Sequence, residues 1–164
     1  MANRTRISLL IAVSALFAPT GCIRQPGTST AKVADEVRKD AAELVADYNA
    51  QNADAAAAWD APDYVGIYHG AANTVGPAAD LAGMRATMAA AKVHWQIGEG
   101  KVTVSRAGDL GIFEAPYSFT ITTQQGGVST EAGNWIAIFK RGEDGKLKLW
   151  RSIASDTPQP KRGA

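Results

Sequence analysis

The chain has 164 residues, with 17 basic and 16 acidic side chains and a formal net charge of +1. A nearly neutral chain without a basic stripe lacks the charge pattern of nucleic-acid-binding proteins, so we expect no nucleic-acid partner. The two histidines lack close ligand spacing and the cysteine is single, which predicts no metal site. The sequence carries neither a phosphate-cradling glycine loop nor a nucleophile elbow, so we expect no cofactor.

The first segment of the chain has the charge order of a secretory signal. Arg4 and Arg6 precede an apolar run at residues 7–18. A helix that spans a bilayer needs roughly 20 apolar residues, so this run is too short for a permanent anchor. We therefore predict a signal peptide over residues 1–21 and export to the bacterial cell envelope.

Cys22 is the only cysteine in the sequence, and it follows directly after the apolar segment. It resembles the lipobox cysteine of bacterial lipoproteins, although Pro19 stands where leucine is usual. We expect Cys22 to be lipidated and to anchor the protein to a membrane; simple cleavage or an uncleaved anchor are the alternatives. Residues 22–30 then form a lipidated tether, residues 31–157 one domain and residues 158–164 a loose tail.

Three helices are predicted in the first half of the domain. Apolar residues at helical spacing predict a helix over residues 31–48, which Ser29 or Thr30 can cap. Asn52 is the expected N-cap of a short second helix. A proline at a first helical position opens the third helix, over residues 77–92.

Alternating apolar and polar residues predict strands in the rest of the domain. One strand, at residues 64–69, lies between the second and third helices and has a short partner near residues 74–75. The other strands follow the third helix, at residues 93–97, 102–105, 110–123, 134–140 and 147–154. Because short glycine turns join these strands, we predict an α+β domain with an antiparallel sheet and helices packed on one face.

Two short patterns in the domain resemble a known family. Residues 52–64 run from Asn-Ala-Asp through Trp59 to Asp63-Tyr64, and residues 133–141 read Gly-Asn-Trp-Ile-Ala-Ile-Phe-Lys-Arg before an Asp-Gly-Lys turn. Over residues 31–157 the chain resembles the nuclear-transport-factor-2-like (NTF2-like) superfamily, in its SnoaL-like and DUF4440 branch. The resemblance implies a cystatin-like fold, in which N-terminal helices wrap a curved sheet into a cone, and it also implies a homodimer.

The expected cone defines the candidate site. A carboxylate in an apolar pocket has a raised pKa and can act as a general base, and a tyrosine hydroxyl can stabilise an oxyanion, so Asp63 and Tyr117 are the catalytic candidates. His69 and Ser152 are further polar groups expected near the cavity. The candidate ligand-binding residues are Trp59, Tyr64, Tyr68, Met84, Met88, His94, Trp95, Phe113, Phe119 and Trp135. Taken singly, each of these residues also fits an ordinary role in a turn, in the core or at the surface.

Three functions remain open on the sequence. The first is a membrane-tethered domain that binds a small apolar or amphipathic molecule or serves as an accessory module. The second is a ketosteroid-isomerase-like or hydratase-like enzyme with an acid or base in the cavity, and the third is a structural dimer subunit. A deep pocket with a buried carboxylate and a nearby tyrosine favours the enzyme, whereas a filled or wholly apolar cone favours the other two functions.

Overall fold

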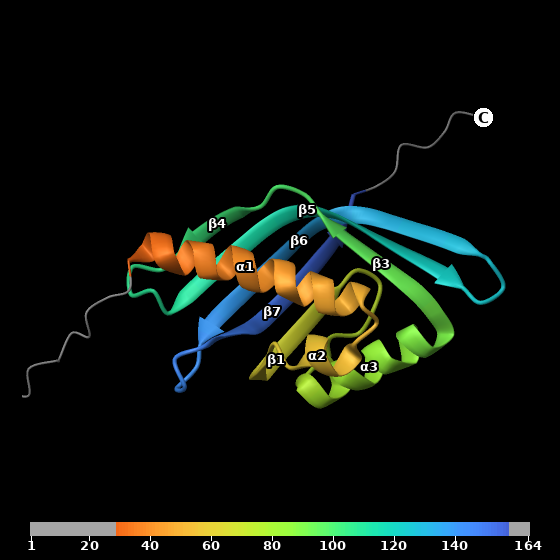
Figure 1. Ribbon diagram of the computed structural model, residues 1–164, viewed down its shortest axis with the longest axis horizontal. Coiled ribbons are helices and arrows are strands. Elements are labelled where there is room, and N and C mark those ends of the chain that lie inside the picture. The colour runs from red at the N-terminus through yellow and green to blue at the C-terminus, as the bar shows by residue number, and fades with distance from the viewer. Residues whose placement is uncertain (1–28, 158–164) are drawn as a thin grey trace, which may run out of the picture.

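The computed structural model describes residues 29–157, which form three helices and a seven-stranded sheet (Figure 1). The predicted signal peptide, the predicted lipidation site Cys22, most of the predicted tether and the tail at residues 158–164 lie outside the described residues. None of the described helices is long and apolar enough to cross a membrane.

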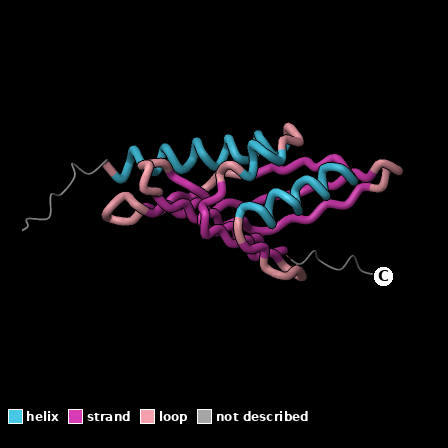
Figure 2. Tube along the Cα trace, turned by 90° about the horizontal axis from the view of Figure 1, so that it is seen from below, coloured by secondary structure: helices cyan, strands magenta, loops and turns pink. Residues whose placement is uncertain are grey.

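Helix α1, Thr30–Asn49, lies along one face of the sheet (Figures 1 and 2). The side chain of Ser29 accepts a backbone amide of the first turn and caps the helix, as the sequence predicts. Val33, Val37 and Leu44 are buried on the side that faces the sheet. The apolar spacing in the sequence therefore identified both the helix and its packing face.

Of the two shorter helices, α3 contacts strand β1, and α2 contacts α1 and α3 (Figure 1). Helix α2 is Ala53–Ala57, and the Asn52 side chain caps it by accepting a backbone amide at 3.1 Å. Helix α3, Pro77–Ala90, begins after Gly76, whose φ of 84° suits a glycine. Met84 is the one residue of α3 that is buried, so this helix has a small apolar contact with the rest of the domain.

The strands follow the order β2-β1-β7-β6-β5-β3 across the sheet, and β4 pairs with β5. Their bounds are β1 Asp60–Tyr68, β2 Thr74–Val75, β3 Ala91–Ile97, β4 Lys101–Val104, β5 Leu110–Thr123, β6 Val128–Arg141 and β7 Leu147–Asp156. Tight turns with glycines at positive φ, Gly126 and Gly145, join β5 to β6 and β6 to β7. The predicted α+β fold class is confirmed, with a sheet that does not close into a barrel.

One strand pair departs from the predicted antiparallel sheet: β1 runs parallel to β7, so the sheet is mixed. Hairpin turns force β5, β6 and β7 to alternate in direction, whereas no short turn joins β1 to β7. Strand β1 also begins at Asp60, four residues before the predicted start. It passes through Pro62 where the register with β7 is irregular, which accommodates a residue without a backbone N–H.

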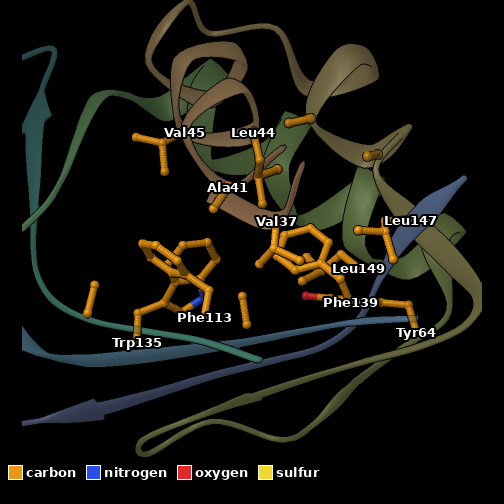
Figure 3. Close-up of a cluster of buried hydrophobic side chains, with 14 of the residues drawn as sticks. Val37, Ala41, Leu44, Val45, Tyr64, Phe113, Trp135, Phe139, Leu147 and Leu149 are labelled. Atoms are coloured by element: carbon orange, nitrogen blue, oxygen red, sulfur yellow. The ribbon is translucent and has the colours of Figure 1, made fainter. Parts of the chain in front are cut away.

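The core lies between α1 and the sheet (Figure 3). Val37, Ala41 and Leu44 of α1 face the aromatic rings of Phe113 and Trp135 from the sheet. Because this core and all the strand pairs of the sheet lie within residues 29–157, we expect a chain of residues 29–164 to fold by itself.

Candidate functional site

A cavity of about 240 Å³ opens beside the C-terminal end of α1, on the face of the sheet that the helix covers. Side chains from α1 and from strands β1, β3, β5, β6 and β7 surround it. Its lining residues are Tyr48, Tyr68, His69, Trp95, Tyr117, Phe119, Glu131, Trp135, Ser152, Ala154 and Asp156.

Aromatic rings form the wall of this cavity, which consists of Tyr48, Trp95, Phe119 and Trp135. The ring of Trp95 lies edge-on to Trp135 with centroids 4.6 Å apart, and edge-on to Tyr48 at 5.6 Å. Such edge-to-face contacts fix the rings in place. The indole N–H of Trp95 is buried and has no hydrogen-bond partner among the described residues. A buried donor without a partner lowers the stability of the fold by about 1 to 3 kcal/mol.

Polar and charged groups surround the mouth of the cavity, which consists of Tyr117, Glu131, Asp156 and His69. The Tyr117 hydroxyl donates to a Glu131 carboxylate oxygen at 3.0 Å and approaches Asp156 at 3.5 Å. Nδ1 of His69 lies 3.1 Å from the other Asp156 oxygen. Burial first, and then the hydrogen bond to Glu131, raise the pKa of Tyr117, so its hydroxyl keeps its proton at neutral pH.

The floor of the cavity consists of Tyr68 and Ser152. The indole N–H of Trp135 donates to the Ser152 hydroxyl at 3.0 Å, and the hydroxyls of Tyr64 and Tyr68 lie 2.8 Å apart. Gly66 lies beneath this tyrosine pair: a Cβ at this position would stand 2.8 Å from the hydroxyl of Tyr64 and 2.9 Å from that of Tyr68. A glycine is therefore needed for the two hydroxyls to meet.

Two carboxyl groups lie behind the floor, on the side of Tyr64 away from the cavity. Asp60 is only 8% exposed, and neither of its carboxylate oxygens has a hydrogen-bond partner among the described residues. Burial, followed by the nearby charge of Asp80, raises the pKa of Asp60 to about 8. Burial likewise raises the pKa of Asp80. With its pKa raised to about 8, Asp60 keeps its proton at neutral pH.

Several solved structures share this architecture. No protein-family model and no curated protein matches the chain. An NTF2-like superfamily protein from Salmonella enterica aligns with a TM-score of 0.71 at 12% identity, over 82% of this chain and 98% of that one. An NTF2-like protein with a cystatin-like fold from Novosphingobium aromaticivorans aligns with a TM-score of 0.65 at 20% identity, over 80% and 86%. The fold is NTF2-like.

A third solved structure with the NTF2-like fold is a ketosteroid isomerase-like protein from Erwinia carotovora. It aligns with a TM-score of 0.65 at 16% identity, over 77% of this chain and 97% of that one. At these identities the likeness shows the fold alone, and the function depends on the side chains of the cavity.

The NTF2-like cavity brings together some of the residues that the sequence predicted for it. Tyr68, Trp95, Phe119 and Trp135 line the cavity with the catalytic candidate Tyr117. His69 and Ser152 line it as well, as expected from the sequence. Tyr64 lies one layer deeper, in contact with Tyr68 rather than with the cavity.

Asp63, the other catalytic candidate, does not line the cavity. Its carboxylate is exposed on the outer face of the sheet, where Lys140 donates to it at 2.8 Å and the Trp150 indole at 2.9 Å. The hydrogen bond from Lys140 is the largest cause that lowers the pKa of Asp63, the opposite of the shift expected for a cavity base. Because successive side chains of a strand alternate between faces, Asp63 and Tyr64 cannot both face the cavity.

Five further candidates lie outside the cavity lining. His94 is exposed, because it alternates with Trp95 along β3. Trp59 bonds Asp47 through its indole N–H at 2.9 Å, and both residues line a separate hollow. The remaining three belong to the core or its edge: Met84, Met88 and Phe113.

Several residues of the site were not predicted from the sequence. Tyr48 continues the apolar face of α1, and its spacing is the signal that can identify it. Glu131 and Asp156 lie far apart in sequence and meet at Tyr117 only because β6 pairs with both β5 and β7. Among residues 29–157 no group of three or more His, Cys, Asp or Glu side chains is placed to hold a metal ion.

Proposed function

We propose that this NTF2-like domain is exported, anchored to a membrane through a lipid on Cys22, and binds a small, largely apolar molecule in its cavity. The observation that carries the binding proposal is the aromatic wall of an open cavity that has polar groups at its mouth. Ligand pockets combine mostly apolar surface with a few polar groups, as this one does. A volume of about 240 Å³ suits a molecule of one or two rings.

The test uses a chain of residues 29–164 and p-cresol as the probe. Binding to the folded state raises the melting temperature as the concentration of p-cresol increases. Trp95→Phe removes part of the aromatic wall and is expected to weaken p-cresol binding by roughly three- to tenfold, because one aromatic contact is worth about 0.5 to 1.5 kcal/mol. The same substitution on the outer face, Trp150→Phe, is the control and is expected to leave binding unchanged. A melting temperature that stays constant up to the solubility limit of p-cresol would refute the proposal.

An acid-base enzyme is the second candidate function. The observation that favours it is Asp60, a buried carboxyl with a pKa of about 8 whose charge acts on Tyr64, the partner of the cavity residue Tyr68. A reaction would show as exchange of the α-protons of a small ketone such as cyclohexanone in D2O. If Asp60→Asn abolished such exchange while p-cresol binding persisted, acid-base catalysis would explain the cavity better than binding alone. Asp63 has no part in this candidate, because it is exposed and ion-paired.

A further inference from the structure

The strand register places one carboxylate of the mouth beside the aromatic wall of the cavity. Trp95 of β3 lies opposite Phe119 of β5, and Phe119 lies opposite Glu131 of β6. All three residues line the cavity, so their side chains lie on the same face of the sheet. The pairing of these three strands therefore brings a negative charge next to the rings.

A second row of residues brings Asp156 to the same place. Tyr117 of β5, Gly133 of β6 and Asp156 of β7 are direct neighbours across the sheet. Because Gly133 has no side chain, Tyr117 and Asp156 can reach each other over it. The Tyr117 hydroxyl lies 3.0 Å from a Glu131 oxygen and 3.5 Å from an Asp156 oxygen. Both carboxylates therefore lie beside one hydroxyl group.

The charges around the cavity are not balanced. Within residues 29–157, no lysine or arginine lines the cavity or forms an ion pair with Glu131 or Asp156. The basic group at the mouth is His69, whose Nδ1 lies 3.1 Å from an Asp156 oxygen. Each carboxylate has several acceptor positions, whereas the Tyr117 hydroxyl has a single proton to donate. Two like charges so close together repel each other, so a cation between them stabilises both.

The aromatic wall favours the same kind of ligand. A cation is attracted to the face of an aromatic ring, most strongly to that of tryptophan, and both Trp95 and Trp135 line the cavity. A ligand whose apolar part fills the cavity can keep its charged group at the mouth, between the rings and the carboxylates. Water still reaches this position, because the side chain of Asp156 is 39% exposed. The ligand therefore does not have to bury its charge completely.

We propose that the ligand of this cavity is a small organic cation, in which an amine or a quaternary ammonium group is attached to an apolar or aromatic body. The proposal rests on the proposed binding function and specifies its ligand class. The charged group lies at the mouth against Glu131 and Asp156, and the body contacts the aromatic wall. A neutral molecule of similar size lacks the attraction to the mouth, and an anion is repelled by it.

Calorimetric titration of residues 29–164 at pH 8 with three compounds of similar size tests the proposal. The compounds are 4-methylbenzylamine, which is a cation, 4-methylbenzyl alcohol, which is neutral, and 4-methylbenzoate, which is an anion. An imidazole is largely neutral at this pH, so the ligand supplies the positive charge. We expect the amine to bind about tenfold more tightly than the alcohol, and the anion to bind more weakly than the alcohol.

Removal of the two charges locates the origin of the preference. Glu131→Gln and Asp156→Asn nearly keep the size of each side chain and leave an acceptor for the Tyr117 hydroxyl. Each variant is expected to lower the preference for the amine to about fivefold, and the double variant to lower it below about threefold, which is the contribution of the rings. Glu114→Gln is the matched control, because it removes an exposed charge from the outer face of β5 and is expected to keep the full preference. Thermal unfolding shows that each variant is folded.

The outcomes distinguish this proposal from the binding function. Equal affinity of the wild type for the amine and the alcohol, or a full preference in the folded double variant, would overturn the cation proposal and leave the binding function standing. An equal loss of preference in Glu114→Gln would also overturn it, because the net charge of the protein would then be the cause. Binding of neither p-cresol nor any of the three compounds would overturn the binding function and the cation proposal with it.

Discussion

The carboxyl group of Asp60 shows how burial changes the chemistry of a single residue. Its pKa of about 8 in the folded state is far above the value of 3.8 for an exposed aspartate. At a pH between these two pKa values, the folded state binds more protons than the unfolded state. A group with a raised folded-state pKa stabilises the fold at low pH, and this contribution is lost as the pH rises through about 8.

Replacement of Asp60 by asparagine removes this pH dependence. The introduced amide can donate to Asp80 without a titrating proton, so we expect Asp60→Asn to lose less stability than the wild type between pH 5 and pH 8. The difference is at least about 1 kcal/mol, since each pKa unit corresponds to about 1.4 kcal/mol. Urea unfolding at the two pH values measures it. Asp35→Asn, at an exposed position of α1, is the matched control and is expected to follow the wild type. Parallel losses in the wild type and Asp60→Asn would show that Asp60 does not hold a proton at neutral pH.

At the scale of the element, the side chains of strand β1 alternate between two chemical environments, the inside of the domain and the outer face of the sheet. Tyr64, Gly66 and Tyr68 face the inside of the domain, and Asp63 faces the outside with Lys140. The absent side chain of Gly66 is as important as the two tyrosines, because it leaves room for their hydroxyls.

We therefore expect Gly66→Ala to disturb the floor of the cavity. The added methyl must displace the tyrosine rings, which costs about 1 to 3 kcal/mol and weakens p-cresol binding. Gly83→Ala in α3 is the matched control, because a Cβ there meets nothing within 4 Å and alanine favours a helix by up to about 1 kcal/mol. Thermal unfolding and p-cresol titration of both variants check this. Equal stability and equal binding of the two variants would mean that the tyrosine pair is not rigidly held.

Local patterns explain which elements can be predicted from the sequence. Helix α1 and its cap, the start of α3 at Pro77, and the hairpins at Gly126 and Gly145 all depend on residues close together in the chain. The parallel pairing of β1 with β7 depends on residues far apart, and no turn chemistry encodes it. The sequence likewise does not predict that Asp60 and Asp80 lie near each other, because they belong to different elements. Alternation predicts that either Asp63 or Tyr64 faces inward, and burial of the larger ring decides in favour of Tyr64.

At the scale of the whole molecule, α1 separates the proposed anchor from the cavity. The helix has 20 residues and is therefore about 30 Å long. Thr30 begins the helix next to the predicted tether, and Tyr48 in its last turn lines the cavity. The cavity thus lies at the opposite end of α1 from Thr30, the residue at which the predicted tether ends.

Lipidation of Cys22 is a prediction for the full-length protein in a bacterial host. We expect the wild type to enter the detergent phase of a Triton X-114 separation and to have Cys22 as its mature N-terminus. Cys22→Ser is expected to enter the aqueous phase or to remain unprocessed, because it lacks the thiol that accepts the lipid. Phase partition and mass spectrometry of the N-terminus measure both properties. A wild-type protein in the aqueous phase with a different N-terminus would contradict lipid anchoring.

The parallel pairing of β1 with β7 also determines when the cavity can form during folding. Strands β5, β6 and β7 pair with their neighbours in sequence, so this meander closes only short loops. Strand β1 must instead find a partner near the other end of the domain, where Tyr68 pairs with Ala154. Closing so long a loop is entropically unfavourable until the meander provides an edge. We therefore expect the cavity floor, with Tyr68 from β1 and Ser152 from β7, to assemble late, so that a nascent chain gains its cavity only after its last strand has emerged.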